Sequence, residues 1–154
     1  MNKLEGRMLI LMTQIKENRS TKDVTLAGIN LGGPRSRILA SRMRFNNSLM
    51  VLHLARKNIA DPEGVELAKF LYDNKTLRKL ELEGNLLGPN SAREFGAGLK
   101  VNKTLRCLDL ESNQLTQDGQ DMQGIYDFIK VSLTQLLISI VSLCQQNATK
   151  FESW

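Results

Sequence analysis

The stretch from Leu77 to Leu87 reads Leu-Arg-Lys-Leu-Glu-Leu-Glu-Gly-Asn-Leu-Leu, and its pattern returns along the chain every 28 residues. The apolar position at Leu82, for example, recurs at Leu26, Leu54 and Leu110. A fixed period of this size is the signature of a solenoid, in which each unit buries its apolar face against its neighbours. The sequence therefore predicts a repeat protein with one long, repetitive surface, a shape that suits binding better than catalysis.

Each unit reads as a strand, a turn and a helix. Leu80 and Leu82 alternate with polar residues, which is the period of a short strand with one buried face. A Gly-Pro-Asn turn follows, and proline is suited to the first turn of a helix. Small and apolar residues then recur at spacings of three and four, as on one face of a helix: Ala92, Phe95, Gly96 and Leu99. We expect small residues at such positions, including Gly64, to let each helix lie close to its strand.

Aligning the units predicts a repeat domain over residues 1–130. It consists of a partial repeat at 1–20, which is the helical half of a unit, and full repeats at 21–48, 49–76, 77–104 and 105–130. Asn-x-Ser/Thr triplets share this period and begin at Asn18, Asn46, Asn74 and Asn102. We interpret these asparagines as left-handed helix ends rather than as glycosylation sites.

The motif Leu-x-x-Leu-x-Leu-x-x-Asn-x-Leu resembles the leucine-rich repeat, and a 28-residue unit with a true helix is similar to the ribonuclease-inhibitor-like subfamily. The resemblance covers residues 4–130. It implies an α/β fold, a leucine-rich-repeat solenoid shaped as a short horseshoe, with parallel strands on the concave face and helices on the convex face. It also implies that Asn85 and Asn113 hydrogen-bond the turn after their strands, whereas Ile29 and Lys57 stand at this position in the first two repeats.

The pattern breaks near the end of the chain. In the fourth helix Met122, Ile125, Tyr126 and Ile129 supply the apolar face, displaced from the expected positions. Residues 131–154 form a divergent hydrophobic tail, predicted as a helix followed by a disordered end. The helical stripe, which includes Leu133 and Ile140, either caps the solenoid or mediates self-association through Leu133–Leu143. Its apolar run is too short to span a membrane.

The abrupt change at Val131 also fits a truncated variant of a longer scaffold protein with an unrelated tail, because Val-Ser is what a translated splice-donor sequence encodes. The chain has two cysteines without framework spacing, which favours a reducing, cytoplasmic compartment. Cytoskeletal or ciliary association is compatible with the family resemblance.

Charge is distributed unevenly. Residues 1–79 carry 15 Lys and Arg against 7 Asp and Glu, whereas residues 80–154 carry 6 against 9. Nucleic-acid binding by the basic half is not expected, because its arginines fall on a convex helix with Phe45 as the sole aromatic platform: Arg35, Arg37, Arg42 and Arg44. We also expect no enzymatic activity, no cofactor and no metal site, since the sequence has one histidine and lacks a phosphate-binding glycine loop.

The candidate site is the concave face, where outward-pointing strand residues stack in columns. The predicted partner-binding residues are His53, Arg78, Glu81, Glu83, Arg106, Asp109 and Glu111. Like charges on neighbouring strands are destabilising, so the stacked Glu81/Asp109 and Glu83/Glu111 pairs indicate an acidic patch for a basic partner, flanked by the two arginines. The alternative interpretation is a solvent-exposed ladder of carboxylates whose mutual repulsion these arginines partly offset. We therefore predict a non-catalytic protein–protein interaction module, with assembly through the hydrophobic tail as the alternative.

Overall fold

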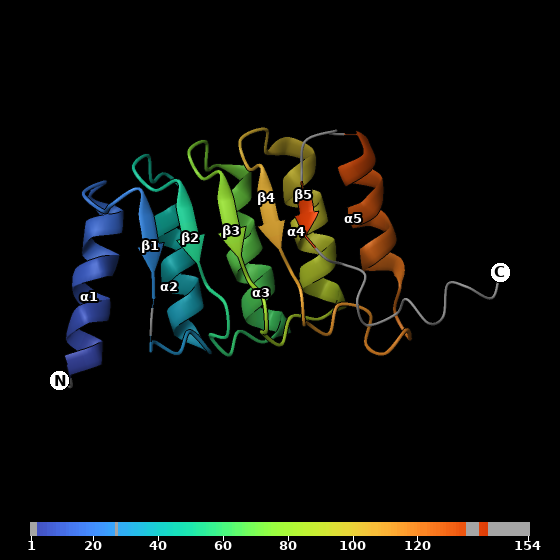
Figure 1. The fold of residues 1–154 in the computed structure, drawn as a ribbon, viewed down its shortest axis with the longest axis horizontal. Coiled ribbons are helices and arrows are strands. Elements are labelled where there is room, and N and C mark those ends of the chain that lie inside the picture. The colour runs from blue at the N-terminus through green and yellow to red at the C-terminus, as the bar shows by residue number, and fades with distance from the viewer. Residues whose placement is uncertain (1–2, 27, 135–138, 142–154) are drawn as a thin grey trace.

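The computed structural model describes residues 3–26, 28–134 and 139–141, with side chains as far as residue 130. Parallel strands form one layer and helices stack behind them in a second layer (Figure 1). The strands are β1 (Asp23–Thr25), β2 (Val51–His53), β3 (Lys79–Glu81), β4 (Cys107–Asp109) and β5 (Ser139–Val141). The helices are α1 (Lys3–Lys16), α2 (Pro34–Met43), α3 (Asp61–Ala68), the 3-10 helix η1 (Lys69–Tyr72), α4 (Pro89–Val101) and α5 (Gln123–Thr134).

The sheet has the order β1-β2-β3-β4-β5, and every neighbouring pair is parallel. Its register follows the sequence period: Val24 pairs with Leu52, Leu52 with Leu80, and Leu80 with Leu108. The predicted leucine-rich-repeat solenoid is confirmed, with strands on the concave face and helices on the convex face. Proline stands in the first turn of α2, α3 and α4, where its missing N–H costs no hydrogen bond.

The core lies between the two layers and is almost entirely aliphatic. Leu52, Leu54, Leu80 and Leu82 are all fully buried, because alternate strand residues point toward the helices. Burying a leucine side chain contributes about 1.5–3 kcal/mol relative to leaving it exposed. Repeating the same leucines in every unit therefore makes the contact between neighbouring repeats the main source of stability.

Asn85 secures the turn after β3, as the family resemblance implied. Its side-chain amide donates to the carbonyl oxygens of Leu54 (2.9 Å) and Leu82 (2.8 Å), and its oxygen accepts from the amides of Lys57 (2.9 Å) and Ile59 (3.1 Å). Three of these partners belong to the preceding repeat. Asn85 therefore joins two units, and the same bonds satisfy the turn of the second repeat, which has Lys57 at the asparagine position.

A second asparagine ladder runs along the other end of the strands, through Asn46, Asn74 and Asn102. Each is buried, and each donates to carbonyl oxygens of the preceding unit while accepting the backbone amide of the first residue of the following unit. The prediction of a left-handed backbone is correct for Asn18, with φ 56°. It is wrong for Asn46, Asn74 and Asn102, none of which has a positive φ. These asparagines recur because their side chains form hydrogen bonds between neighbouring repeats, and not only because they end helices.

The helices are also joined by polar and steric contacts between repeats. Asp61 of α3 accepts hydrogen bonds from the amides of Gly88 (2.9 Å) and Ser91 (2.7 Å), and so caps α4 from the preceding repeat. A Cβ atom added at Gly64 would lie 2.4 Å from Leu87 Cδ2 and 2.3 Å from Ser91 Oγ. The small residue at position 64 therefore serves contact with the next repeat, which corrects the expectation that it serves contact with its own strand.

The fourth repeat contains a longer turn, with positive φ at Gln117, Asp118 and Gly119. This turn displaces α5, which buries Ile125 and Phe128 and leaves Tyr126 57% exposed. The prediction that Tyr126 belongs to the apolar face is therefore wrong, and Phe128 occupies the core instead. Within the described residues, none of the helices has both the length and the apolar character needed to cross a bilayer.

The tail continues the solenoid with a further strand. Helix α5 ends at Thr134, and Ile140 lies in β5, where it pairs with Leu108 at a spacing of 32 residues instead of 28. The expected helical stripe through Ile140 is thus corrected. The adjacent Ile140 and Val141 are β-branched residues, which favour strands, and the open edge of β4 offers them hydrogen-bonding groups. The whole of the proposed self-association segment, Leu133–Leu143, lies outside the residues whose side chains are described.

Candidate protein-binding surface on the concave face

Two columns of side chains project from the exposed face of the sheet, because the central residue of each three-residue strand points into the core. The strand registers align the members of each column directly. The first column contains Asp23, Val51, Lys79 and Cys107. The second contains Thr25, His53, Glu81 and Asp109.

His53 links three strands of this surface. Its Nε2 atom lies 3.0 Å from Asp23 Oδ1 on β1, and its Nδ1 atom forms a hydrogen bond with Glu81 Oε2 on β3. A neutral imidazole donates from one nitrogen only, whereas the protonated ring donates from both. The two ring nitrogens of His53 face one carboxylate on each neighbouring strand.

Glu81 is held between two basic groups. Besides the bond with His53, Lys79 Nζ lies 2.5 Å from Glu81 Oε1. Partial burial by itself would raise the pKa of Glu81, but hydrogen bonds from Lys79 and His53 outweigh this effect and lower it. The same hydrogen bond raises the pKa of Lys79. The charge on Glu81 is thus already compensated within the sheet.

Glu83 lies just beyond β3 and is compensated in a weaker way. Arg56 Nη2 lies 3.0 Å from Glu83 Oε1, and the Arg56 amide donates to the Glu83 carbonyl oxygen at 2.8 Å. The Arg56 side chain is 78% exposed, so this ion pair contributes little to stability. A binding partner could displace Arg56 from Glu83 at small cost.

Asp109 and Glu111 are different, because neither has an ion-pair partner within 4.0 Å in the part of the chain that the structure describes. Asp109 Oδ1 accepts a hydrogen bond from the Glu111 amide at 3.0 Å. The four predicted carboxylates therefore divide into two that form ion pairs, Glu81 and Glu83, and two that form none among the described residues, although Asp109 lies close enough to Lys79 to help raise the pKa of that lysine. The acidic patch is smaller than the sequence indicated and lies toward the C-terminal repeats.

Arg78 and Arg106 lie just outside the two strand columns, and both are exposed. Each directly precedes its strand, where its amide donates to the neighbouring repeat, and Arg78 Nη1 reaches the Thr104 carbonyl oxygen at 3.1 Å. Lys79, which pairs with Glu81, is the basic residue that the sequence analysis missed. Strand alternation could have found it, because residues 79 and 81 share the face opposite Leu80.

The described residues contain no group of three or more His, Cys, Asp or Glu side chains arranged to hold a metal ion. Cys107 is a free, partly exposed thiol in the first column, and burial raises its pKa, which disfavours the reactive thiolate. The exposed face of the sheet therefore presents charged and hydrogen-bonding side chains across several parallel strands. The molecule is a repeat solenoid with a polar sheet face.

Comparison with known proteins assigns the solenoid to a class. A family described as "Leucine Rich repeat" matches residues 101–119. The C-terminal domain of tropomodulin from Caenorhabditis elegans has a similar structure, with a TM-score of 0.73 and 18% identity over 96% of this chain and 87% of that chain. A structure titled "Leiomodin-1 Actin-Binding Site 2 (ABS2)" gives a TM-score of 0.65 and 17% identity over 84% of this chain and 74% of that chain. Among curated proteins, no relative matches significantly.

The repeated motif, the observed solenoid, the family match over residues 101–119 and the similar solved structures agree on a leucine-rich-repeat fold.

Proposed function

We propose that this chain is a non-catalytic protein-interaction module that binds a basic segment of a partner protein across the concave face. The observation that carries the proposal is the pair Asp109 and Glu111, which form no ion pair among the described residues although the neighbouring Glu81 and Glu83 are paired. Neighbouring like charges oppose folding, and a basic partner segment would offset that repulsion. Opposite charge would also steer the encounter between the two proteins.

The surroundings of this pair support a site of defined shape. The network of Asp23, His53, Glu81 and Lys79 holds the adjacent strand residues in place, and Arg56 is exposed enough to move toward a partner's carboxylate. A basic residue of the partner would lie over Asp109, while polar groups would contact His53. We place this activity in the cytoplasm, in keeping with the free Cys107 thiol.

The test is charge reversal at Asp109 and Glu111 only, the two carboxylates without a close ion pair. The variant Asp109→Lys/Glu111→Lys leaves the His53–Glu81 and Lys79–Glu81 contacts intact, and a matched control, Glu63→Lys/Asp118→Lys, changes the net charge equally away from the sheet face. Wild-type chain, variant and control are immobilised, and the captured proteins are quantified at low and high salt. We expect partners captured by wild type and control to be lost by the variant. Equal capture by all three would refute the concave-face assignment.

Purified actin is the first defined probe, because one structurally similar protein is titled an actin-binding site. If actin binds wild type and control but not the variant, it is a ligand of this face. If it binds none of the three, actin is excluded and the capture experiment still decides the proposed site.

A further inference from the structure

The convex face of α2 carries apolar side chains where the repeat pattern elsewhere has charges. Ile38 of α2 is 42% exposed, and Phe45, in the turn that directly follows α2, is 74% exposed beneath the Arg44 guanidinium, 5.3 Å from its ring centroid. The residues 28 positions later are Glu66 and Asp73, which is the polar choice expected for a solvent-facing helix. Ile10, 28 positions before Ile38, is also 61% exposed on α1. Exposed apolar residues that gather on one face indicate an interaction site.

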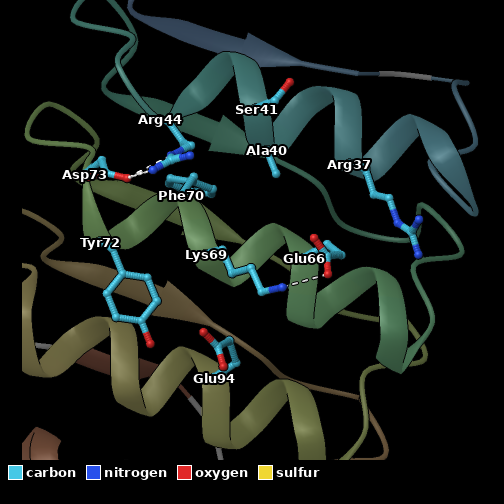
Figure 2. Close-up of a pocket in the computed structure, with 10 residues that line it drawn as sticks. All are labelled: Arg37, Ala40, Ser41, Arg44, Glu66, Lys69, Phe70, Tyr72, Asp73 and Glu94. Carbon is cyan, nitrogen blue, oxygen red and sulfur yellow. Dashed lines mark hydrogen bonds and ion pairs between the residues drawn. The ribbon is translucent and has the colours of Figure 1, made fainter.

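A groove adjoins this face, between α2 and the helices of the next two repeats. Its volume is about 580 Å³, and Figure 2 shows its lining, in which Ala40 and the fully buried Phe70 are apolar. Its remaining lining residues are Arg37, Ser41, Arg44, Glu66, Lys69, Tyr72, Asp73 and Glu94. An apolar side chain of a partner could lie over Ala40, above the buried Phe70, while its backbone and polar groups reach the charged rim.

The charge of α2 indicates what would bind there. Four arginines stand between positions 35 and 44 without any acidic residue among them. Arg44 pairs with Asp73, at 2.6 Å, and Arg35 lies 4.0 Å from Glu5. Arg37 and Arg42 have no ion pair within 4.0 Å among the described residues. Arg37 lines the groove and lies close enough to Glu66 to help lower the pKa of that carboxyl group, whereas Arg42 lies outside the groove lining. The convex surface of α2 thus carries positive charge without a close ion pair, beside exposed apolar side chains.

The groove's other charges select among anionic partners. Glu66 and Asp73 lie on the wall opposite α2, and Glu94 projects from α4 (Figure 2). A nucleic acid or an anionic membrane presents negative charge continuously and would meet these carboxylates with repulsion. An amphipathic polypeptide can place its acidic residues against Arg37 and Arg42 and its apolar residues over Ile38 and Phe45.

From these observations we propose that the convex face of α2, with the adjoining groove, is a second interaction surface for an acidic amphipathic helix of a partner protein. It lies on the helical layer, opposite the concave sheet face. The two surfaces can therefore be occupied at the same time, and the chain would join two partners.

The test uses the full chain and a fluorescent synthetic helix of about 18 residues, or five turns, with leucine on one face and glutamate on the other. We expect saturable binding by fluorescence anisotropy, and much weaker binding of the same peptide with lysine replacing glutamate. The variant Ile38→Glu/Phe45→Asp installs the residues that the next repeat has at these positions. It should weaken binding at least about tenfold, which corresponds to about 1.4 kcal/mol.

Val101→Asp is the matched control, since Val101 is 50% exposed and stands two repeats after Phe45; it should bind as wild type does. Arg37→Gln/Arg42→Gln removes the charge without changing the apolar surface, and should also weaken binding if the first variant fails to fold. Failure of the acidic peptide to bind, equal binding of the lysine peptide, or unchanged binding by both variants would overturn the proposal. So would variant-sensitive binding to phosphatidylserine vesicles or single-stranded RNA without peptide binding.

Discussion

Replacing Asn74 with alanine should remove one link of the buried asparagine ladder and destabilise the whole solenoid. Asn74 is 1% exposed and makes four hydrogen bonds with backbone groups. Its amide donates to the carbonyl oxygens of Met43 (2.7 Å) and Asn46 (3.1 Å), and its oxygen accepts from the amides of Thr76 (3.0 Å) and Leu77 (2.8 Å). At a net value of about 0.5–1.5 kcal/mol per hydrogen bond, these bonds contribute about 4 kcal/mol together.

That loss is large against a total stability of about 5–15 kcal/mol for a domain. With a urea dependence of about 2 kcal/mol per molar, the unfolding midpoint should fall by about 2 M. Urea titration followed by far-ultraviolet circular dichroism measures it. Asn47→Ala is the matched control, since Asn47 is exposed one residue from the ladder asparagine Asn46, and it should change stability by less than about 0.5 kcal/mol.

The variant Asn74→Asp tests the donor half of the argument. Its carboxyl group would face the carbonyl oxygens of Met43 and Asn46, which disfavours the charged form and raises its pKa in the folded state. A group with a raised folded pKa contributes stability below its unfolded pKa and loses it as the pH rises through the folded value. Asn74→Asp should therefore be closest to wild type in acid. If Asn74→Ala costs less than about 1 kcal/mol, the ladder does not hold the repeats together.

Three further predictions concern contacts between repeats and the sheet face. Gly64→Ala should destabilise by about 1–3 kcal/mol through overpacking against Ser91; a urea midpoint equal to wild type would contradict the close approach. Asp61→Ala should cost about 1–2 kcal/mol by uncapping α4. Burial alone would raise the pKa of Asp61, but hydrogen bonds, chiefly from Ser91, lower it. The stabilisation by Asp61 should therefore be present above the pKa of the unfolded state and be lost as the pH falls through the pKa of the folded state. A difference in stability from wild type that does not depend on pH would refute the cap. Glu81 likewise has a lowered pKa, so Glu81→Gln should reduce the loss of unfolding free energy that wild type shows as the pH falls. If the variant loses stability in acid as wild type does, the contacts of Glu81 with His53 and Lys79 do not stabilise the fold.

The fold was largely predictable from one recurring pattern. Leu80 and Leu82 recur in fixed register, and the observed strand pairs follow that register from β1 to β4. Prediction failed where the pattern ended. The longer turn at 116–122 moved Phe128 into the core, and the open edge of β4 paired with Ile140 at a shifted spacing. The 28-residue period predicts neither the position of Phe128 nor the pairing of Ile140. Both depend on the core volume and the unpaired backbone groups that the preceding repeat leaves available.

The candidate site was predictable in composition but not in charge balance. Strand alternation correctly placed His53, Glu81 and Asp109 in one column. It could not show that His53 and Lys79 compensate Glu81, because that depends on the distance between side chains of different strands. The groove beside Arg37 and Phe70 was equally invisible, since it exists only between helices of successive repeats.

By itself, the sequence determined the repeat, the strand register and the residues available on each face, since all three follow from a period of 28 residues and from side-chain alternation. Tertiary structure alone decided which charges are paired, which asparagines join neighbouring units and where the convex groove lies. The physical reason is that ion pairs, buried hydrogen bonds and hollows are set by distances of a few ångströms between repeats. For that reason Glu81 and Glu83 form ion pairs whereas Asp109 and Glu111 form none among the described residues, although all four carry the same charge in the sequence.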